Sequence, residues 1–365
     1  MKISRMNIYE FSLPLLKPLE LKGVMHDSRK GLLIKLTDNT GAVGWGECSP
    51  LPEFSAESVN DVTSELKRVR FTLQGYDIPD NLEELSGGFE RWFGEYELSV
   101  STRFGFESAV LNLLASQRGV PVRQLLSDES CDEISVNGLV TTPPNNIKGE
   151  ITRLVEQGFR TIKLKVGRAT LAEDIQTVGV VLDALPNYAA LRLDANRAWS
   201  YEDAFMFAST VDRERIEYIE EPLADPANLP RLIKETGIPV ALDESLVGAS
   251  PESLQLHDGI KALILKPTLL GGLETAMKFA RKAIRSGIKA VVSSSFESSL
   301  GLRMLAEFAA SLGDLHTAHG LDTAGWLAVD TVADTFVITD GKVSLTRYAS
   351  TPSVNPDALS EISYD

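Results

Sequence analysis

Residues 133–313 alternate between short apolar runs and longer amphipathic stretches. Each apolar run has the length of a strand, and the stretch that follows repeats its apolar positions at helical spacing. Strands are expected at 133–140, 160–167, 190–199, 216–223, 238–245, 260–267 and 288–296. Helices are expected at 145–158, 170–185, 201–214, 228–237, 250–259, 272–287 and 299–313, and several of them end in glycine. Seven βα units in series predict an α/β fold, either a barrel or a long doubly wound sheet.

The N-terminal part of the chain has a different order, with strands first and helices after. Residues 2–13 and 31–51 are expected to form strands, with turns at Gly/Asn stretches such as DNTG. A helix is expected at 55–73, with Ser55 or Ser58 as its N-cap. This order is typical of an α+β domain.

These patterns divide the chain into three parts. We expect an α+β domain over residues 1–97 and a (β/α) domain over residues 98–330, with a helix that starts near Ser101. The tail, residues 331–365, contains FVITDGKVSLT, whose Asp-Gly pair is a hairpin turn signal. The tail is expected to pack back on the first domain.

Charged residues at the ends of successive predicted strands favour a barrel over an open sheet. The series runs through Lys165, Asp194, Glu220, Asp243 and Lys266, in steps of 29, 26, 23 and 23 residues. The carboxyl ends of all strands meet at one mouth of a barrel, whereas an open sheet spreads them along an edge. The spacing therefore predicts a modified TIM barrel whose active site lies at this mouth.

Three acids of this series predict a metal site. Asp194, Glu220 and Asp243 would repel one another at one barrel mouth unless a cation held them. Carboxylate oxygens suit Mg²⁺, with Mn²⁺ as the alternative, and without His or Cys beside them zinc fits poorly. A solvated loop carboxylate is the simpler interpretation of any one acid alone, but three at matching strand ends favour the metal.

Two lysines in the stretch KLK predict a base. Lys163 and Lys165 share one face of a strand, because side chains alternate. Burial and a second ammonium group lower the pKa of a lysine, so Lys163 is expected to tune Lys165. Lys266 comes from the opposite wall of the barrel. The alternative is that these lysines only balance the acids; otherwise the set predicts proton abstraction beside a carboxylate that the metal binds.

Composition excludes several classes of function. The chain has 365 residues, a formal net charge of −15 and no cluster of Lys or Arg, so neither nucleic acid nor an anionic membrane is an expected partner. Cys48 and Cys131 fit neither a disulfide framework nor a metal motif. No signal peptide or membrane-span pattern is found. We expect a cytoplasmic protein that acts on a small carboxylate.

The motifs KLK, LDAN, IEEP, LDES and LKP at successive strand ends, with GWGECSPL near the N-terminus, resemble the muconate lactonising enzyme subgroup of the enolase superfamily. Within that subgroup RLDANRAW, LKPTLLGG and SSSFESSLGL are similar to the o-succinylbenzoate synthase family. The resemblance covers essentially the whole chain. It implies a (β/α)7β barrel capped by the α+β domain, and dehydration of a cyclohexadiene carboxylate in menaquinone biosynthesis.

The resemblance also implies roles for single residues. Asp194, Glu220 and Asp243 would be the Mg²⁺ ligands. Lys165 would remove the α-proton and then assist loss of the hydroxyl, while Lys266 would stabilise the intermediate. Expected neighbours of the reacting groups are Arg192, which would orient Asp194, Asn196 beside Asp194, and Glu244 paired with Lys266.

Two loops are expected to shape specificity. LKGVMHDSRK, at 21–30, is taken as a mobile loop that caps the barrel mouth in this family. SSSFESS follows the seventh strand, and its Ser293 and Ser295 are expected to hold the succinyl end of the substrate. The alternative for this second stretch is an ordinary Ser-rich loop. Glu297 in it is either a site residue or a helix-capping acid.

Two other functions stay open. A racemase or epimerase of N-acylamino acids would use the same two lysines on opposite faces. Dipeptide epimerases usually carry an Asp-x-Asp pair in the last barrel loop, where this chain reads AHGLDTAGWLAVDT, with Asp322 but no such pair. The second alternative is a barrel that only binds or supports a partner; such proteins usually lose a base or a metal ligand, and here the whole set is present. The oligomeric state is not predicted.

Overall fold

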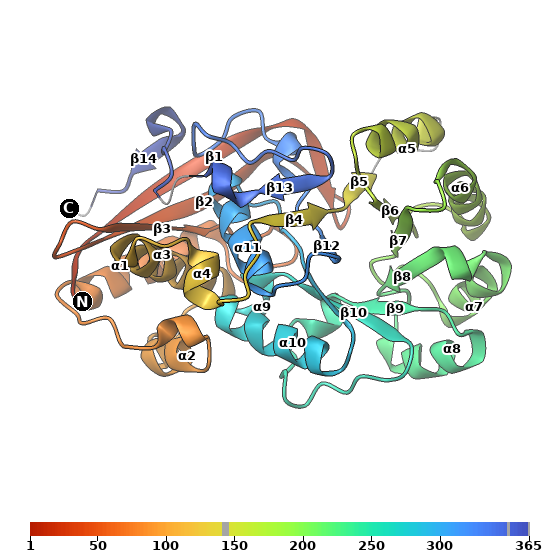
Figure 1. Cartoon of the computed structure of the whole chain (residues 1–365), viewed down its shortest axis with the longest axis horizontal. Coiled ribbons are helices and arrows are strands. Elements are labelled where there is room, and N and C mark those ends of the chain that lie inside the picture. The colour runs from red at the N-terminus through yellow and green to blue at the C-terminus, as the bar shows by residue number, and fades with distance from the viewer. Residues whose placement is uncertain (141–145, 349–350, 364–365) are drawn as a thin grey trace.

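The computed structural model describes residues 1–140, 146–348 and 351–363 (Figure 1). In this part of the chain an antiparallel sheet, whose first strands are drawn in red and whose last strand is drawn in blue in Figure 1, stands beside a ring of parallel strands with helices around it.

The N-terminal sheet has the strand order β14-β1-β2-β3. Its strands are β1 (Ile3–Leu21), β2 (Val24–Asp38), β3 (Val43–Cys48) and β14 (Leu359–Glu361). The helices that follow β3 are α1 (Val59–Leu73), α2 (Gly88–Phe93), α3 (Val100–Arg118) and α4 (Val122–Leu126). Of the two predicted N-caps of α1, Ser58 is the observed one, because its hydroxyl accepts from the amide of Asp61 and Asp61 caps it in return.

Two glycines of the GWGE stretch let α3 pack directly on β3. A Cβ atom on Gly46 would lie 1.9 Å from the carbonyl oxygen of Gly105, and one on Gly44 would lie 2.0 Å from that of Ala109. Only glycine permits so close an approach of helix to strand. Phe104 and other side chains of α3 lie in an apolar core that runs on into the barrel. This contact fixes the N-terminal sheet against the barrel.

The parallel ring contains the predicted strands and one more. The strands are β4 (Glu133–Val136), β5 (Gly138–Val140), β6 (Thr161–Lys165), β7 (Ala190–Asp194), β8 (Ile216–Glu220), β9 (Val240–Leu242), β10 (Ile260–Leu265), β11 (Lys289–Val292) and β12 (Ala318–His319). The helices outside them are α5 (Ile147–Glu156), α6 (Leu171–Ala184), α7 (Tyr201–Thr210), α8 (Leu229–Thr236), α9 (Pro267–Leu270), α10 (Leu273–Arg285) and α11 (Ser299–Ser311).

Hydrogen bonds close this ring. Strands β5 to β11 form one parallel sheet in sequence order, and β4 continues into β5 around Asn137. Strand β12 pairs in parallel with β4, and a bridge between Ser293 and Gly320 joins it to the end of β11. The predicted (β/α)7β barrel is confirmed. In the described chain no α-helix follows β12, and only a short 3-10 helix, Glu244–Leu246, lies between β9 and β10.

Two predictions about the elements of the barrel are wrong. Residues 250–259 form turns and irregular chain and not a helix. Pro251 and Gly259 bound the stretch, and its two leucines, Leu254 and Leu256, are two positions apart, so they do not share one face of a helix although both pack against the core. Strand β12 was missed because its two residues, Ala318 and His319, are too short to show a period. The start of the predicted helix 145–158 lies partly outside the described residues, and α5 begins at Ile147.

The stretch expected as a mobile loop at 21–30 is also corrected. It forms the end of a long hairpin, because β1 continues to Leu21, a turn at Lys22 and Gly23 follows, and β2 starts at Val24. Both turn residues have positive φ, 45° and 83°, as a tight two-residue turn between twisted strands requires.

The tail adds strands to two sheets. Asp340 and Gly341 form the predicted turn, with hydrogen bonds exchanged between Thr339 and Lys342. Beyond that bridge the expected hairpin does not continue, because β13 (Lys342–Ser344) pairs with β4 instead. Strand β14 then pairs with β1 in the N-terminal sheet. The domain limits at 97 and 330 stay predictions. Among the described residues, no helix combines the length and apolarity of a membrane span.

Candidate active site

The ends of three neighbouring strands place three carboxylates together. In the ladder Lys165 pairs with Asp194, Asp194 with Glu220, and Glu220 with Ala241, so these positions lie at one level of the barrel. Asp243 follows just beyond the end of β9. One oxygen of each of the three acids lies within 4.8 Å of the others, and all three side chains are buried.

This acid cluster fits a hard divalent cation. Its donors are all oxygens, and it contains neither imidazole nor thiolate. Ligand oxygens at about 2.1 Å from one ion are up to about 4.2 Å apart, close to the separations found here. Three buried like charges would otherwise repel one another strongly. The residues present therefore suit an ion such as Mg²⁺.

Both lysines of β6 face the acid cluster. Lys163 Nζ lies 2.8 Å from Asp194 Oδ2 and 2.5 Å from Glu220 Oε2. Lys165 Nζ lies 2.7 Å from the same Asp194 oxygen. The two ammonium groups thus share one face of the strand, as their spacing predicted.

The surroundings of these two lysines move their pKa values in opposite directions. Burial lowers the pKa of Lys165. The negative charge of Asp194 raises it, but the positive charges of Lys163 and Lys266 lower it again, so the pKa stays below its usual value. For Lys163, the charges of Asp194 and Glu220 overcome burial and hold its pKa well above the usual range. Lys163 therefore stays charged while Lys165 is displaced toward the neutral form that a base requires.

The acids respond to the same charges. Burial raises the pKa of Glu220 to about 7. The neighbouring carboxylates of Asp194 and Asp243 raise it further, whereas the positive charge of Lys163 lowers it. Burial also opposes the charge of Asp194, but Lys163, Lys165 and Lys266 outweigh it and hold the pKa of Asp194 well below its usual value. Like and unlike charges are thus balanced inside one small buried cluster.

Lys266 enters the cluster from the end of β10. Its Nζ lies 2.5 Å from Asp243 Oδ2. Burial lowers its pKa, but Asp243 and Glu244 raise it above the usual value, so the group is charged. Lys165 and Lys266 contact the first and the last of the three acids in strand order.

Asn196 and Glu244 extend this set of contacts. The side-chain oxygen of Asn196 accepts from Lys165 at 2.7 Å, and its nitrogen donates to Glu244 at 2.9 Å. Asn196 is therefore a bridge between the two loops. Burial and Asp243 raise the pKa of Glu244, while the charge of Lys266 acts in the opposite direction.

Arg192 does not take the predicted position. Its guanidinium donates to Glu217, to the carbonyl of Ala318 and, at 3.4 Å, to Asn137. These partners lie toward the start of the strands, and the group stacks on Tyr218 at 4.9 Å. The expectation that Arg192 contacts and orients Asp194 is wrong. Arg192 lies two positions earlier on the same face of the strand, so its side chain lies one layer deeper in the barrel.

The serines of the strand-seven loop differ from one another. Ser293 donates to the carbonyl of Gly320 at 3.4 Å, whereas the buried hydroxyl of Ser295 has no hydrogen-bond partner among the described residues. The amide of Ser295 donates to Glu297, whose other oxygen accepts from Thr268. Glu297 thus fixes the backbone of this loop by connecting Ser295 to Thr268.

Sequence reasoning missed that the N-terminal sheet holds this loop. Arg29 is buried and donates to the carbonyls of Ser295 and Phe296 and, within its own domain, to those of Ser49 and Pro50. The loop residue Phe296 has a φ of 60°, which a side chain tolerates only when its surroundings impose it. No sequence signal marks an arginine whose partners are backbone carbonyls of a distant loop.

Glu47 anchors the next turn. Its carboxylate accepts from the amides of Ser298 and Gly301 and from the hydroxyl of Ser298, at the start of α11. It therefore caps a barrel helix from the N-terminal domain. Its position in the GWGECSPL stretch was the available signal, since an acid between apolar strand residues is unusual.

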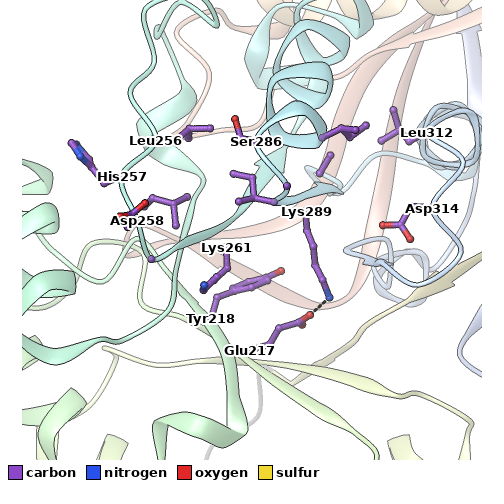
Figure 2. A pocket seen from close by; sticks show the side chains of 16 residues that line it. Glu217, Tyr218, Leu256, His257, Asp258, Lys261, Ser286, Lys289, Leu312 and Asp314 are labelled. Carbon is purple, nitrogen blue, oxygen red and sulfur yellow. Dashed lines mark hydrogen bonds and ion pairs between the residues drawn. The ribbon is translucent and has the colours of Figure 1, made fainter.

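A cavity of about 990 Å³ lies at the opposite end of the barrel (Figure 2). It is lined by residues at the starts of β8, β10 and β11, among them the ion pair of Glu217 with Lys289. Chemistry in barrels of this kind occurs at the carboxyl ends of the strands. We therefore place the active site at the acid cluster and not in this cavity.

Two family matches and a curated relative cover most of the chain. A MenC N-terminal domain matches residues 3–81, and an enolase C-terminal domain-like family matches residues 146–349. The o-succinylbenzoate synthase of Pasteurella multocida (strain Pm70) is 34% identical over 327 residues, which are 88% of this chain and 89% of that protein. The chain belongs to the o-succinylbenzoate synthase family of the enolase superfamily. Members of this superfamily bind a divalent metal.

Two further proteins show how widely this architecture is used. Protein PHYLLO, chloroplastic, of Arabidopsis thaliana is 33% identical over 346 residues, but the chain spans only 20% of its length. The solved structure of a substrate-liganded L-Ala-D/L-Glu epimerase from Bacillus subtilis has a TM-score of 0.83 at 25% identity and covers 97% of this chain and 98% of that one. This likeness confirms the fold, a (β/α)7β barrel with an N-terminal α+β domain.

Proposed function

We propose that this member of the o-succinylbenzoate synthase family removes water from 2-succinyl-6-hydroxy-2,4-cyclohexadiene-1-carboxylate to form 2-succinylbenzoate in menaquinone biosynthesis. The observation that carries the proposal is the contact of Lys165 with Asp194 inside the acid cluster, 2.7 Å between Nζ and Oδ2. It places a lysine of lowered pKa beside the ligands for a cation. Relatives named for this reaction cover nearly the whole chain.

Asp194, Glu220 and Asp243 would hold the metal, for which Mg²⁺ is the best match to three carboxylates. When bound, the metal supplies positive charge beside the substrate carboxylate and so makes the neighbouring C–H bond more acidic. The substrate is a small carboxylate, and its acidic group is expected at this end of the site. A reducing cytoplasm is the proposed location, in keeping with two free cysteines, Cys48 and Cys131.

Lys165 acts as the base and then as the acid. Its neutral amine accepts the α-proton, and the resulting ammonium donates a proton to the departing hydroxyl. One C–H and one C–O bond break, water leaves, and the ring becomes aromatic. Asn196 fixes the Lys165 nitrogen through a 2.7 Å hydrogen bond, and Lys163 maintains the positive charge that lowers the pKa of Lys165.

Lys266 stays charged and provides electrostatic stabilisation. Its ammonium is held by Asp243, the last of the three acids in strand order, whereas Lys165 contacts Asp194, the first. A buried ammonium there stabilises negative charge that develops on the substrate, since preorganised charges are strong in a low-dielectric site. Ser293 and Ser295 are proposed to hold the succinyl end, because the hydroxyl of Ser295 has a free hydrogen-bonding capacity among the described residues.

The racemase alternative is not better supported. Asp322, in the last loop region, accepts a hydrogen bond from the amide of Leu139, and burial raises its pKa. Three relatives of 33–34% identity, each matched over 89% of its own length, are named o-succinylbenzoate synthase.

A direct assay tests the proposal. The purified chain with Mg²⁺ should convert each molecule of the cyclohexadiene carboxylate into one molecule of 2-succinylbenzoate. The reaction is monitored by the loss of the diene absorbance. The matched samples are the same chain with excess chelator and a Lys165→Ala variant, and both should be inactive. A wild-type chain that binds Mg²⁺ and leaves this substrate unchanged would overturn the proposal.

A further inference from the structure

A second layer of side chains lies behind the acid cluster. The chain that follows each of the three acids supplies one member: Arg197 follows Asp194, Glu221 follows Glu220, and Ser245 follows Asp243. The three members contact one another, so the three loops after the strands are joined at a second level.

Glu221 is the centre of this layer. One of its carboxylate oxygens accepts from the amide of Asp243 at 2.9 Å and from the amide of Ser245 at 2.7 Å. The other oxygen accepts from the Ser245 hydroxyl at 2.9 Å and from Arg197 Nε at 3.0 Å. The carboxylate is buried, and four donors satisfy it. Arg197 also donates to the Ser245 hydroxyl at 2.8 Å, which closes the layer.

The backbone around this layer is held in an uncommon conformation. Asn196, Arg197 and Glu221 have φ angles of 43°, 61° and 39°, in the left-handed region that side chains rarely adopt. The amide of Arg197 donates to the carbonyl of Glu221 at 2.7 Å. Such backbone persists only where the surroundings impose it, and the Glu221 contacts supply that constraint.

Asp243 depends on this constraint more than the other two acids. Asp194 and Glu220 lie within β7 and β8, where the ladder fixes their direction. Strand β9 ends at Leu242, so Asp243 lies outside the ladder, and its amide is bound by Glu221. Without Glu221, the backbone amide of Asp243 would lose this hydrogen bond.

We propose that Glu221 is a positioning residue that sets the direction of Asp243 through its backbone amide and thereby determines the affinity of the acid cluster for a divalent metal. This inference rests on the proposed metal site. Arg197 acts indirectly, because it holds the Glu221 carboxylate in place. Neither residue belongs to the acid cluster itself.

Titration of the full chain with Mn²⁺ alone tests this, with free Mn²⁺ followed by its electron paramagnetic resonance signal. Glu221→Gln keeps the size of the side chain but presents an amide to Arg197, and should weaken Mn²⁺ binding by roughly tenfold to a hundredfold. Arg197→Met should weaken it in the same direction by a smaller factor. Arg197 is 32% exposed, so this variant is expected to fold even if the buried substitution does not.

Glu217→Gln is the matched control. Glu217 lies near the start of β8, whose last residue, Glu220, directly precedes Glu221. It is ion-paired with Arg192 and Lys289 at the opposite end of the barrel from the acid cluster, and Figure 2 shows its pair with Lys289. This variant should lower the melting temperature and leave Mn²⁺ affinity unchanged. Equal weakening by Glu217→Gln would overturn the inference, because the effect would then be general destabilisation. Wild-type Mn²⁺ affinity in a folded Glu221→Gln variant would also overturn the inference. If Glu221→Gln does not fold, wild-type Mn²⁺ affinity in Arg197→Met would overturn it. A wild-type chain that binds no Mn²⁺ would instead contradict the metal site itself, and with it the proposed function.

Discussion

Lys165 and Asp194 are paired across the β6–β7 ladder, and Lys165 Nζ lies 2.7 Å from a carboxylate oxygen of Asp194. Parallel pairing brings the ends of two successive strands to one level, so a proposed base and a proposed metal ligand become neighbours although 29 residues separate them.

Asp243→Asn should weaken metal binding and lower turnover by at least about 100-fold, since the charge stabilisation that a metal supplies is worth several kcal/mol. Asparagine has the same size, and Asp243 lies outside the ladder, so the fold should persist. Calorimetric titration with Mg²⁺ and circular dichroism measure the two effects. Asp258→Asn, an exposed acid at the opposite end of the barrel, is the control and should behave as wild type. Unchanged activity of Asp243→Asn at limiting Mg²⁺ would remove Asp243 from the ligand set.

Lys163→Ala should shift the acid limb of the pH–rate profile. The charge of Lys163 lowers the pKa of Lys165, so its removal raises that pKa, and the base becomes neutral only at higher pH. The acid limb of kcat/KM should therefore move upward in pH. A profile that falls in amplitude while its limbs stay in place would show that Lys163 does not tune the base.

Arg29→Met should destabilise the contact between the two domains. The buried guanidinium bonds carbonyls on both sides, and its removal leaves them unpaired, so the free energy of unfolding should fall by about 3–5 kcal/mol. Urea denaturation measures this. The control is Arg231→Met, which removes an exposed ion pair with Glu235 and should change stability by less than about 1 kcal/mol. Equal stability of the two variants would contradict the role given to Arg29.

Glu107 should make stability depend on pH between about 4.5 and 8. Burial raises its pKa to about 8, so in this window the folded chain keeps a proton that the unfolded chain has lost. Its contribution is complete below the unfolded pKa and is lost as pH rises, at roughly 1.4 kcal/mol per unit at most. Glu107→Gln should flatten this dependence, so its stability relative to wild type should improve from pH 5 to pH 8. A parallel pH dependence in the two proteins would refute the assignment.

The strand-end residues could be predicted from the sequence because the parallel ladder translates spacing directly into proximity. Steps of about one βα unit placed Lys165, Asp194, Glu220, Asp243 and Lys266 at one mouth, and the structure brings them together. The same reasoning failed for Arg192, because a shared face of a strand does not imply a shared layer of the barrel.

The residues that were missed act through backbone groups. Arg29 binds carbonyls more than 260 residues away in the chain, and Glu221 binds the amides of Asp243 and Ser245. Backbone donors and acceptors exist at nearly every position, so side-chain types give no sign of such contacts. Strand β12 was missed for a related reason, since two residues that complete a ladder need no apolar pattern of their own.

The central claim is that Lys165, on one face of the substrate, moves the proton in a dehydration. Proton nuclear magnetic resonance in D₂O, with a slowly reacting carboxylate analogue that keeps its α-proton, tests it most directly by comparing Lys165→Ala with Lys266→Ala. Both variants should lose turnover, Lys165→Ala at or beyond the upper end of the ~10²–10⁴-fold expected of a general base. Lys266→Ala should still exchange the α-proton for deuterium, and Lys165→Ala should not. The reverse pattern would make Lys266 the base, and efficient exchange with inversion of an N-succinylamino acid by the wild-type chain would contradict the dehydratase in favour of a racemase.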